Sequence, residues 1–174
     1  MNRLIYRVLS SRFGAYLELQ ILMQQTAKAF DAEVPKAVVR STSELLKIYA
    51  EFTAKEASRA IQHGDDLEAL HQKLYQMAHA LGSRLRRWLR PKDEKDCFSV
   101  ISLLYRNIGI QICEESPGTV CVRKCYFGGF YTPEICDLIS AIDQGIFAGI
   151  YQGGKLTFHE RITEGCAVCR ADFR

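Results

Sequence analysis

The stretch TPEICDLISAIDQGIFAGIYQGGKLTFHERITEGCAVCRADF, residues 132–173, contains one predicted helix and one predicted hairpin. Thr132-Pro133 predicts the start of the helix, because the fixed backbone of proline suits the first helical position. We expect the helix to end at Gly153-Gly154. The segments KLTFHERI and AVCRADF then have the composition of strands and flank the turn TEGC.

A second hairpin is expected upstream, where IGIQIC and VCVRKCYF flank the turn-like EESPGT. Four helices are expected before it: residues 15–31, Ser41/Glu44 to His63-Gly64, Asp65/Glu68 to Pro91, and DEKDCFSVISLLYRN up to Gly109. The order αααα-ββ-α-ββ predicts an α+β fold, with the N-terminal helices packed on a four-stranded antiparallel sheet. Nothing marks a boundary, so we expect one domain over 1–174, helical at 1–108 and cysteine-bearing ββαββ at 109–174.

The composition is that of a folded globular protein, with 48% hydrophobic residues in 174 and a net charge of +3. No apolar run is long enough to span a membrane, and we expect a cytoplasmic protein. The run SRLRRWLRPK is interpreted as a solvated helix end, so no nucleic-acid partner is expected. The partner we expect is a small-molecule ligand, with a homodimer as an alternative.

Apolar residues recur at roughly helical spacing near the N-terminus. They are Leu4, Val8, Phe13, Leu17 and Ile21. This spacing predicts an amphipathic helix whose apolar face packs on the domain. A targeting or surface-binding helix is the alternative.

Seven cysteines are many for this length, and in a reducing compartment clustered cysteines favour metal or redox chemistry over disulfides. Cys166 and Cys169 form a CxxC beside a glycine turn, a geometry that suits metal binding. Cys125 is expected at a strand end and Cys136 in the first turn of a helix, where the helix dipole favours thiolate. These four are the predicted ligands of zinc or an iron–sulfur cluster, and the alternative is that they are small buried hydrophobes. The other three, Cys97, Cys113 and Cys121, are expected in the core.

Several other residues are candidates for a site. Glu160 shares a predicted strand face with apolar neighbours, and a buried carboxylate needs a partner or a ligand. Arg161 is expected to bind a ligand carboxylate or to pair across the hairpin. Gly145 and Gly149 lie on one helical face, where either helix packing or a ligand along an apolar cavity would explain them. Asp143 is a candidate acid or base.

The segment CDLISAIDQGIFAGIYQGGKLTFHERITEGCAVCRADF resembles the 4-vinyl reductase domain and the L-2-amino-thiazoline-4-carboxylic acid hydrolase-like family. The matching residues are Gly145, Gly149, Gly153, Arg161, Thr163, Gly165, Cys169 and Phe173, with Cys125 and Cys136 as the upstream cysteines. The chain departs from the hydrolase pattern in the distance from Cys136 to Asp143 and in the extra Cys166. The resemblance implies a fold like the subunits of trafficking complexes, with a small-ligand pocket beside a cysteine cluster.

Three functions follow as hypotheses. The first is a metal- or cluster-bearing small-molecule-binding domain, with metal ligands Cys125, Cys136, Cys166 and Cys169 and ligand-binding residues Gly145, Gly149, Glu160 and Arg161. The second is a hydrolase of small cyclic amino-acid-like substrates, with catalytic residues Cys136, Asp143 and Glu160 and with His159 as the activating imidazole. The third is an interaction subunit that uses the fold as a scaffold.

Overall fold

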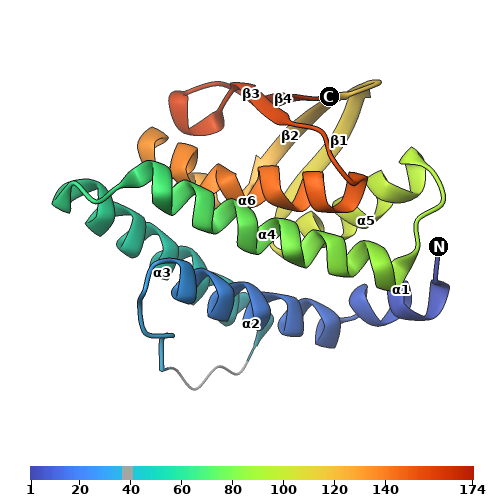
Figure 1. Cartoon of the computed structure of the whole chain (residues 1–174), viewed down its shortest axis with the longest axis horizontal. Coiled ribbons are helices and arrows are strands. Elements are labelled where there is room, and N and C mark those ends of the chain that lie inside the picture. Colours follow the sequence, from blue (N-terminus) through green and yellow to red (C-terminus); the bar gives the residue numbers. More distant parts are fainter. Residues whose placement is uncertain (37–40) are drawn as a thin grey trace.

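The computed structural model describes residues 1–36 and 41–174 (Figure 1). Five helices come before the sheet: α1 (Arg3–Leu9), α2 (Arg12–Ala29), α3 (Thr42–His63), α4 (Leu67–Leu89) and α5 (Glu94–Asn107). They are followed by β1 (Ile110–Ser116), β2 (Thr119–Cys125), the short 3-10 turn η1 (Tyr126–Gly129), α6 (Pro133–Tyr151), β3 (Leu156–Glu160), the 3-10 turn η2 (Ile162–Glu164) and β4 (Cys169–Phe173).

The prediction of four helices before the sheet was wrong, because a further helix, α1, precedes α2. Ser11 caps α2 by accepting a hydrogen bond from the Gly14 amide. A side chain at Gly14 would lie 2.2 Å from the Val8 carbonyl oxygen, so only glycine permits this sharp turn between the helices.

The predicted helix starts are largely confirmed by their caps. Ser41 accepts a hydrogen bond from the amide of Glu44, and Thr132 accepts one from the third residue of α6. The cap of α4 is Asp66 rather than Asp65. These contacts are local, which is why the sequence reveals them.

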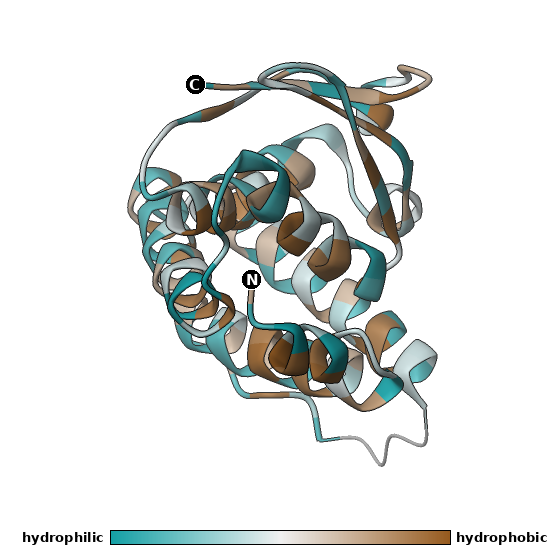
Figure 2. Cartoon of the chain, turned by 90° about the vertical axis from the view of Figure 1, so that its right-hand side faces the viewer, coloured by the Kyte–Doolittle hydropathy of each residue, from teal (hydrophilic) through white to brown (hydrophobic). Residues whose placement is uncertain are grey.

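The four strands form one antiparallel sheet in the order β1-β2-β4-β3, so the predicted α+β class and the two hairpins are confirmed. The hairpins join where Val120 pairs with Ala171 and Val122 with Cys169. In Figures 1 and 2 the helices lie on one side of the sheet, with α6 between the sheet and α4. Helix α6, which connects the two hairpins, is therefore the helix that lies directly against the sheet.

An irregularity in the pairing of β3 with β4, between Phe158 and Glu160, changes which side chains point inward. The Glu160 side chain is 40% exposed and forms an ion pair of 2.7 Å with Arg170. The prediction of a buried Glu160 on the apolar face was therefore wrong. The neighbouring Arg161 is buried, and its guanidinium lies 4.4 Å from the centre of the Phe158 ring.

Helices α4 and α6 pack with their backbones in contact. A side chain at Gly145 would lie 2.4 Å from the Tyr75 carbonyl oxygen, and one at Gly149 would lie 2.4 Å from that of His79. Gly82 of α4 and Gly149 of α6 face each other at the crossing. The glycines of α6 are thus explained by close helix packing.

The apolar face at the N-terminus does not pack on the domain, contrary to the prediction. Leu4 is 73% exposed and Phe13 is 65% exposed. The remaining three, Val8, Leu17 and Ile21, are also exposed. Among the helices of the described residues, none is long and apolar enough to cross a membrane.

Candidate functional site

A small cavity of about 80 Å³ lies between α6, the end of β2 and the start of β4. We call it the cysteine cavity, because three thiols line it. Its lining residues are Leu22, Tyr49, Ile108, Ile110, Cys125, Phe127, Gly128, Tyr131, Cys136, Ile139, Ser140, Ile142, Asp143, Ile162, Thr163 and Cys169.

Three of the four predicted metal ligands meet at this cavity. Cys125 ends β2, where its sulfur accepts hydrogen bonds from the amides of Phe127 and Gly128, and burial raises its pKa to about 12. The sulfur of Cys169 accepts a hydrogen bond of 3.3 Å from the Ile162 amide, and burial raises its pKa as well. Both side chains are therefore neutral thiols near pH 7.

The fourth predicted ligand, Cys166, is not among the residues that line the cavity. Among residues 1–36 and 41–174, no group of three or more His, Cys, Asp or Glu side chains is close enough to hold a metal ion. The metal or cluster stays a prediction, and the side chains as they stand do not form its coordination sphere.

Cys136 lies in the first turns of α6, where the cap at Thr132 fixes the start of the helix. The buried guanidinium of Arg161 donates to Cys136 Sγ at 3.6 Å. The same guanidinium donates to Asp137 Oδ1 at 2.9 Å and to Ser140 Oγ at 3.3 Å. Arg161 thus pairs with α6 rather than with a partner across the hairpin, and it places a fixed positive charge beside the cavity.

Asp143 lies two turns further along α6 and lines the same cavity as Cys136. Tyr105 of α5 donates a hydrogen bond of 2.6 Å to Asp143 Oδ1. Burial raises the pKa of Asp143 to about 6, while the Tyr105 hydroxyl and the charge of Arg161 act in the opposite direction. Asp143 therefore changes protonation just below neutral pH.

Thr163 lines the cavity, and its Oγ1 is shielded from solvent and has no hydrogen-bond partner among the described residues. The two tyrosine hydroxyls nearby are already engaged. Tyr49 shares a hydrogen bond with Thr26, and Tyr131 shares one with Thr53. A buried hydroxyl without a partner is costly, so Thr163 marks a place where a ligand atom would complete the hydrogen bonding.

A second cavity of about 190 Å³ adjoins the first and shares Leu22, Ile108, Ile142 and Asp143 with it. We call it the Glu18 cavity. The other residues that line it are Leu9, Leu17, Glu18, Ile21, Leu81, Arg84, Leu85, Trp88, Leu104, Tyr105 and Ile146. Asn107 donates to Glu18 Oε2 at 2.7 Å, and burial raises the pKa of Glu18 to about 8. Both cavities are apolar, with a carboxyl group at their junction and another inside the larger one.

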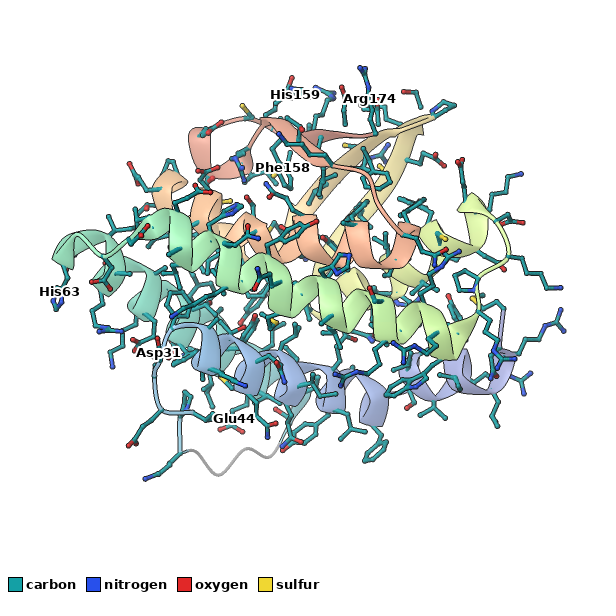
Figure 3. All side chains as sticks on the ribbon, in the orientation of Figure 1. Asp31, Glu44, His63, Phe158, His159 and Arg174 are labelled. Atoms are coloured by element: carbon teal, nitrogen blue, oxygen red, sulfur yellow. The ribbon has the colours of Figure 1, made fainter. Side chains whose placement is uncertain are left out.

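The remaining predicted site residues lie elsewhere. In Figure 3, Phe158 points toward the helices whereas His159 points away from them. His159 Nε2 lies 3.1 Å from Asp172 Oδ2 on the outer side of the sheet, so the predicted activating imidazole does not face the cavity. Glu160 binds Arg170, and Gly145 and Gly149 contact α4 and line neither cavity.

Three residues of the site were not predicted from the sequence: Glu18, Tyr105 and Thr163. Glu18 interrupts an otherwise apolar helical pattern between Leu17 and Leu19, which is a signal that was available. Thr163 belongs to the matching residues of the family resemblance but was given no role. Nothing in the sequence indicated that Tyr105 would face Asp143, because 38 residues separate them.

Comparison with known proteins gives no family or function for this cavity region. No protein-family model matches the chain, and no curated protein matches it significantly.

Proposed function

We propose that the protein binds a small, largely apolar molecule that carries one polar group, with the polar group beside Asp143 and Thr163. The observation that carries the proposal is the buried, unpartnered hydroxyl of Thr163, a residue that lines an apolar cavity together with the carboxyl group of Asp143. Ligand sites commonly combine an apolar lining with a few polar groups that fix the orientation of the ligand.

The size of the cavities supports this class of ligand. An apolar cavity of about 150 Å³ accommodates benzene. The Glu18 cavity, at about 190 Å³, is large enough for an aromatic or branched aliphatic body. Because Asp143 lines both cavities, a molecule in the larger one lies beside this carboxyl group.

The test compares two probes of matched shape, phenol and toluene, in NMR titrations of the full chain. We expect phenol to bind more tightly than toluene, because its hydroxyl offers a hydrogen bond to Thr163 Oγ1, which has no partner among the described residues. Thr163→Val, which keeps the shape of the side chain, should remove the preference. The matched control is Thr157→Val at an exposed position of β3. Equal binding of both probes, or no binding of either, would contradict the proposal.

A second candidate, the hydrolase, is favoured by one specific observation. Cys136 and Asp143 lie on one face of α6 and line the same cavity, and Arg161 lies beside Cys136. In this arrangement Cys136 is the nucleophile, Asp143 transfers the proton and Arg161 binds a substrate carboxylate. The test is ring opening of L-2-amino-thiazoline-4-carboxylate, followed by chromatography. Activity lost in Cys136→Ser and kept in Cys113→Ser would support it, and an inactive wild-type protein would exclude this substrate.

A further inference from the structure

Six large apolar side chains are exposed at one end of the helical part. We call them the docking face: Leu4, Val8, Phe13, Leu17, Ile21 and Trp88. Their exposed fractions range from 37% for Leu17 to 73% for Leu4. Isolated apolar residues on a surface are ordinary, but a contiguous group indicates a binding surface.

The docking face is carried by three helices that contact one another, α1, α2 and α4. Leu17 and Ile21 of α2 line the mouth of the Glu18 cavity together with Trp88 of α4. Helix α1 lies beside the end of α4, where the Asn2 amide donates to the Leu89 carbonyl oxygen. In Figure 2, hydrophobic ribbon segments lie next to the N-terminus on the side that faces the viewer.

Six exposed arginines lie in or next to the helices that carry the docking face. Residues 1–17 contain three arginines and no acidic residue, and the last turns of α4 add three exposed arginines. The six are Arg3, Arg7, Arg12, Arg84, Arg87 and Arg90. None of their guanidinium groups has a hydrogen bond or an ion pair with a residue that the structure describes. Their charge is therefore free to meet an external anion.

We propose that the docking face binds the surface of an anionic lipid bilayer. Exposed apolar side chains flanked by free arginines are the arrangement with which helices lie in the membrane interface. Each arginine near an anionic leaflet adds favourable energy, and the apolar side chains enter the region between headgroups and acyl chains. The mouth of the Glu18 cavity then faces the bilayer, so an apolar ligand enters from the lipid.

Two other occupants fit the same surface less well. A nucleic acid would neutralise the arginines but would leave Leu4 and Phe13 without an apolar partner. A second copy of the chain would cover the apolar residues but would bring six unpaired arginines of each copy close to those of the other. Of these three occupants, the anionic lipid surface is the one that matches both the charge and the apolar area.

The experiment uses the full chain with vesicles of phosphatidylcholine, alone or mixed with phosphatidylserine. Trp88 is the single tryptophan, so its fluorescence reports directly on the docking face. We expect a blue shift and co-sedimentation with the anionic vesicles, both weakened by salt because exposed charges are screened. Vesicles without phosphatidylserine should bind much less protein.

Two sets of variants separate the apolar and the electrostatic contributions. Leu4→Ser with Phe13→Ser should weaken binding about tenfold or more, because two exposed apolar side chains no longer enter the interface. Arg3→Gln, Arg7→Gln and Arg12→Gln together should weaken it roughly a hundredfold. The matched controls are Val34→Ser with Leu67→Ser, and Lys124→Gln with Lys155→Gln, which change exposed residues elsewhere.

Three results would overturn the proposal. The first is no preference for anionic vesicles. The second is an equal loss of binding in the control variants. The third is a stable dimer in sedimentation velocity that Leu4→Ser with Phe13→Ser dissociates, since a second copy would then cover the face.

Discussion

The hydroxyl of Tyr105 donates a 2.6 Å hydrogen bond to Asp143, and this contact joins α5 to α6 where the two cavities meet. The bond favours the ionised carboxylate and so opposes the effect of burial. The protonation state of Asp143 therefore depends on a residue from the helical part of the chain.

Tyr105→Phe is expected to raise the pKa of Asp143 above about 6, because the variant removes the hydrogen bond that lowers it and keeps the burial that raises it. Carbon-detected NMR titration of the carboxyl group measures this change. Tyr16→Phe is the control, because Tyr16 accepts its hydrogen bond from Gln20 and has no contact with Asp143. An unchanged pKa in Tyr105→Phe would show that the bond is absent in solution.

Glu18 makes the stability of the fold depend on pH. Its pKa rises from an ordinary 4.5 to about 8 in the folded chain, so the folded state holds the proton more tightly than the unfolded state. The contribution of the protonated Glu18 to the free energy of unfolding is fully present below pH 4.5. It is lost as the pH rises to about 8. The slope approaches about 1.4 kcal/mol per pH unit in the middle of this window. The pKa of Asp143 rises from 3.8 to about 6, so this group also lowers the free energy of unfolding as the pH rises between these values.

Glu18→Gln should remove most of this pH dependence above pH 6, where Asp143 contributes little, because the amide keeps the shape of the side chain and does not ionise. Urea unfolding at several pH values measures the free energy of unfolding. The control is Glu33→Gln, since the Glu33 side chain is 92% exposed. If the variant lost stability with rising pH as steeply as the wild type, the burial of Glu18 would not be the cause.

Gly149→Ala should destabilise the fold by roughly 1–3 kcal/mol, because the added methyl group would lie 2.4 Å from the His79 carbonyl oxygen and 2.7 Å from the Ser83 amide nitrogen. Backbone atoms cannot rotate away, so α4 and α6 must separate. Gly129→Ala is the matched control, because nothing lies within 4 Å of its added carbon. Equal stability of the two variants in thermal unfolding would contradict the close packing of these helices.

The predicted metal is tested at Cys166. A four-thiolate site needs this cysteine, whereas the structure brings only Cys125, Cys136 and Cys169 to the cavity. We therefore expect Cys166→Ser to leave the zinc and iron content of anaerobically purified protein unchanged. Loss of stoichiometric metal in this variant, with the fold intact by circular dichroism, would instead support the four-cysteine site.

The structure brings together some of the residues that the family resemblance and the cysteine pattern singled out, and it separates others. The pattern identified Cys125, Cys136 and Asp143, which do line one cavity. It also included Glu160, which the irregularity in β3 turns toward Arg170. A one-residue slip in a strand exchanges its two faces, and the alternation of residues does not reveal where a slip occurs.

The sequence by itself determined the secondary structure from Ser41 onward, because caps, glycine stops and the proline at the start of α6 act within a few residues. It also determined the two hairpins, in each of which the paired strands follow one another along the chain. Only the tertiary structure decided that Arg161 is buried, that Glu18 and Tyr105 reach the cavities, and that no described residue covers Leu4 and Phe13. These outcomes depend on contacts between residues far apart in sequence, and burial is a property of the assembled layers rather than of any local segment.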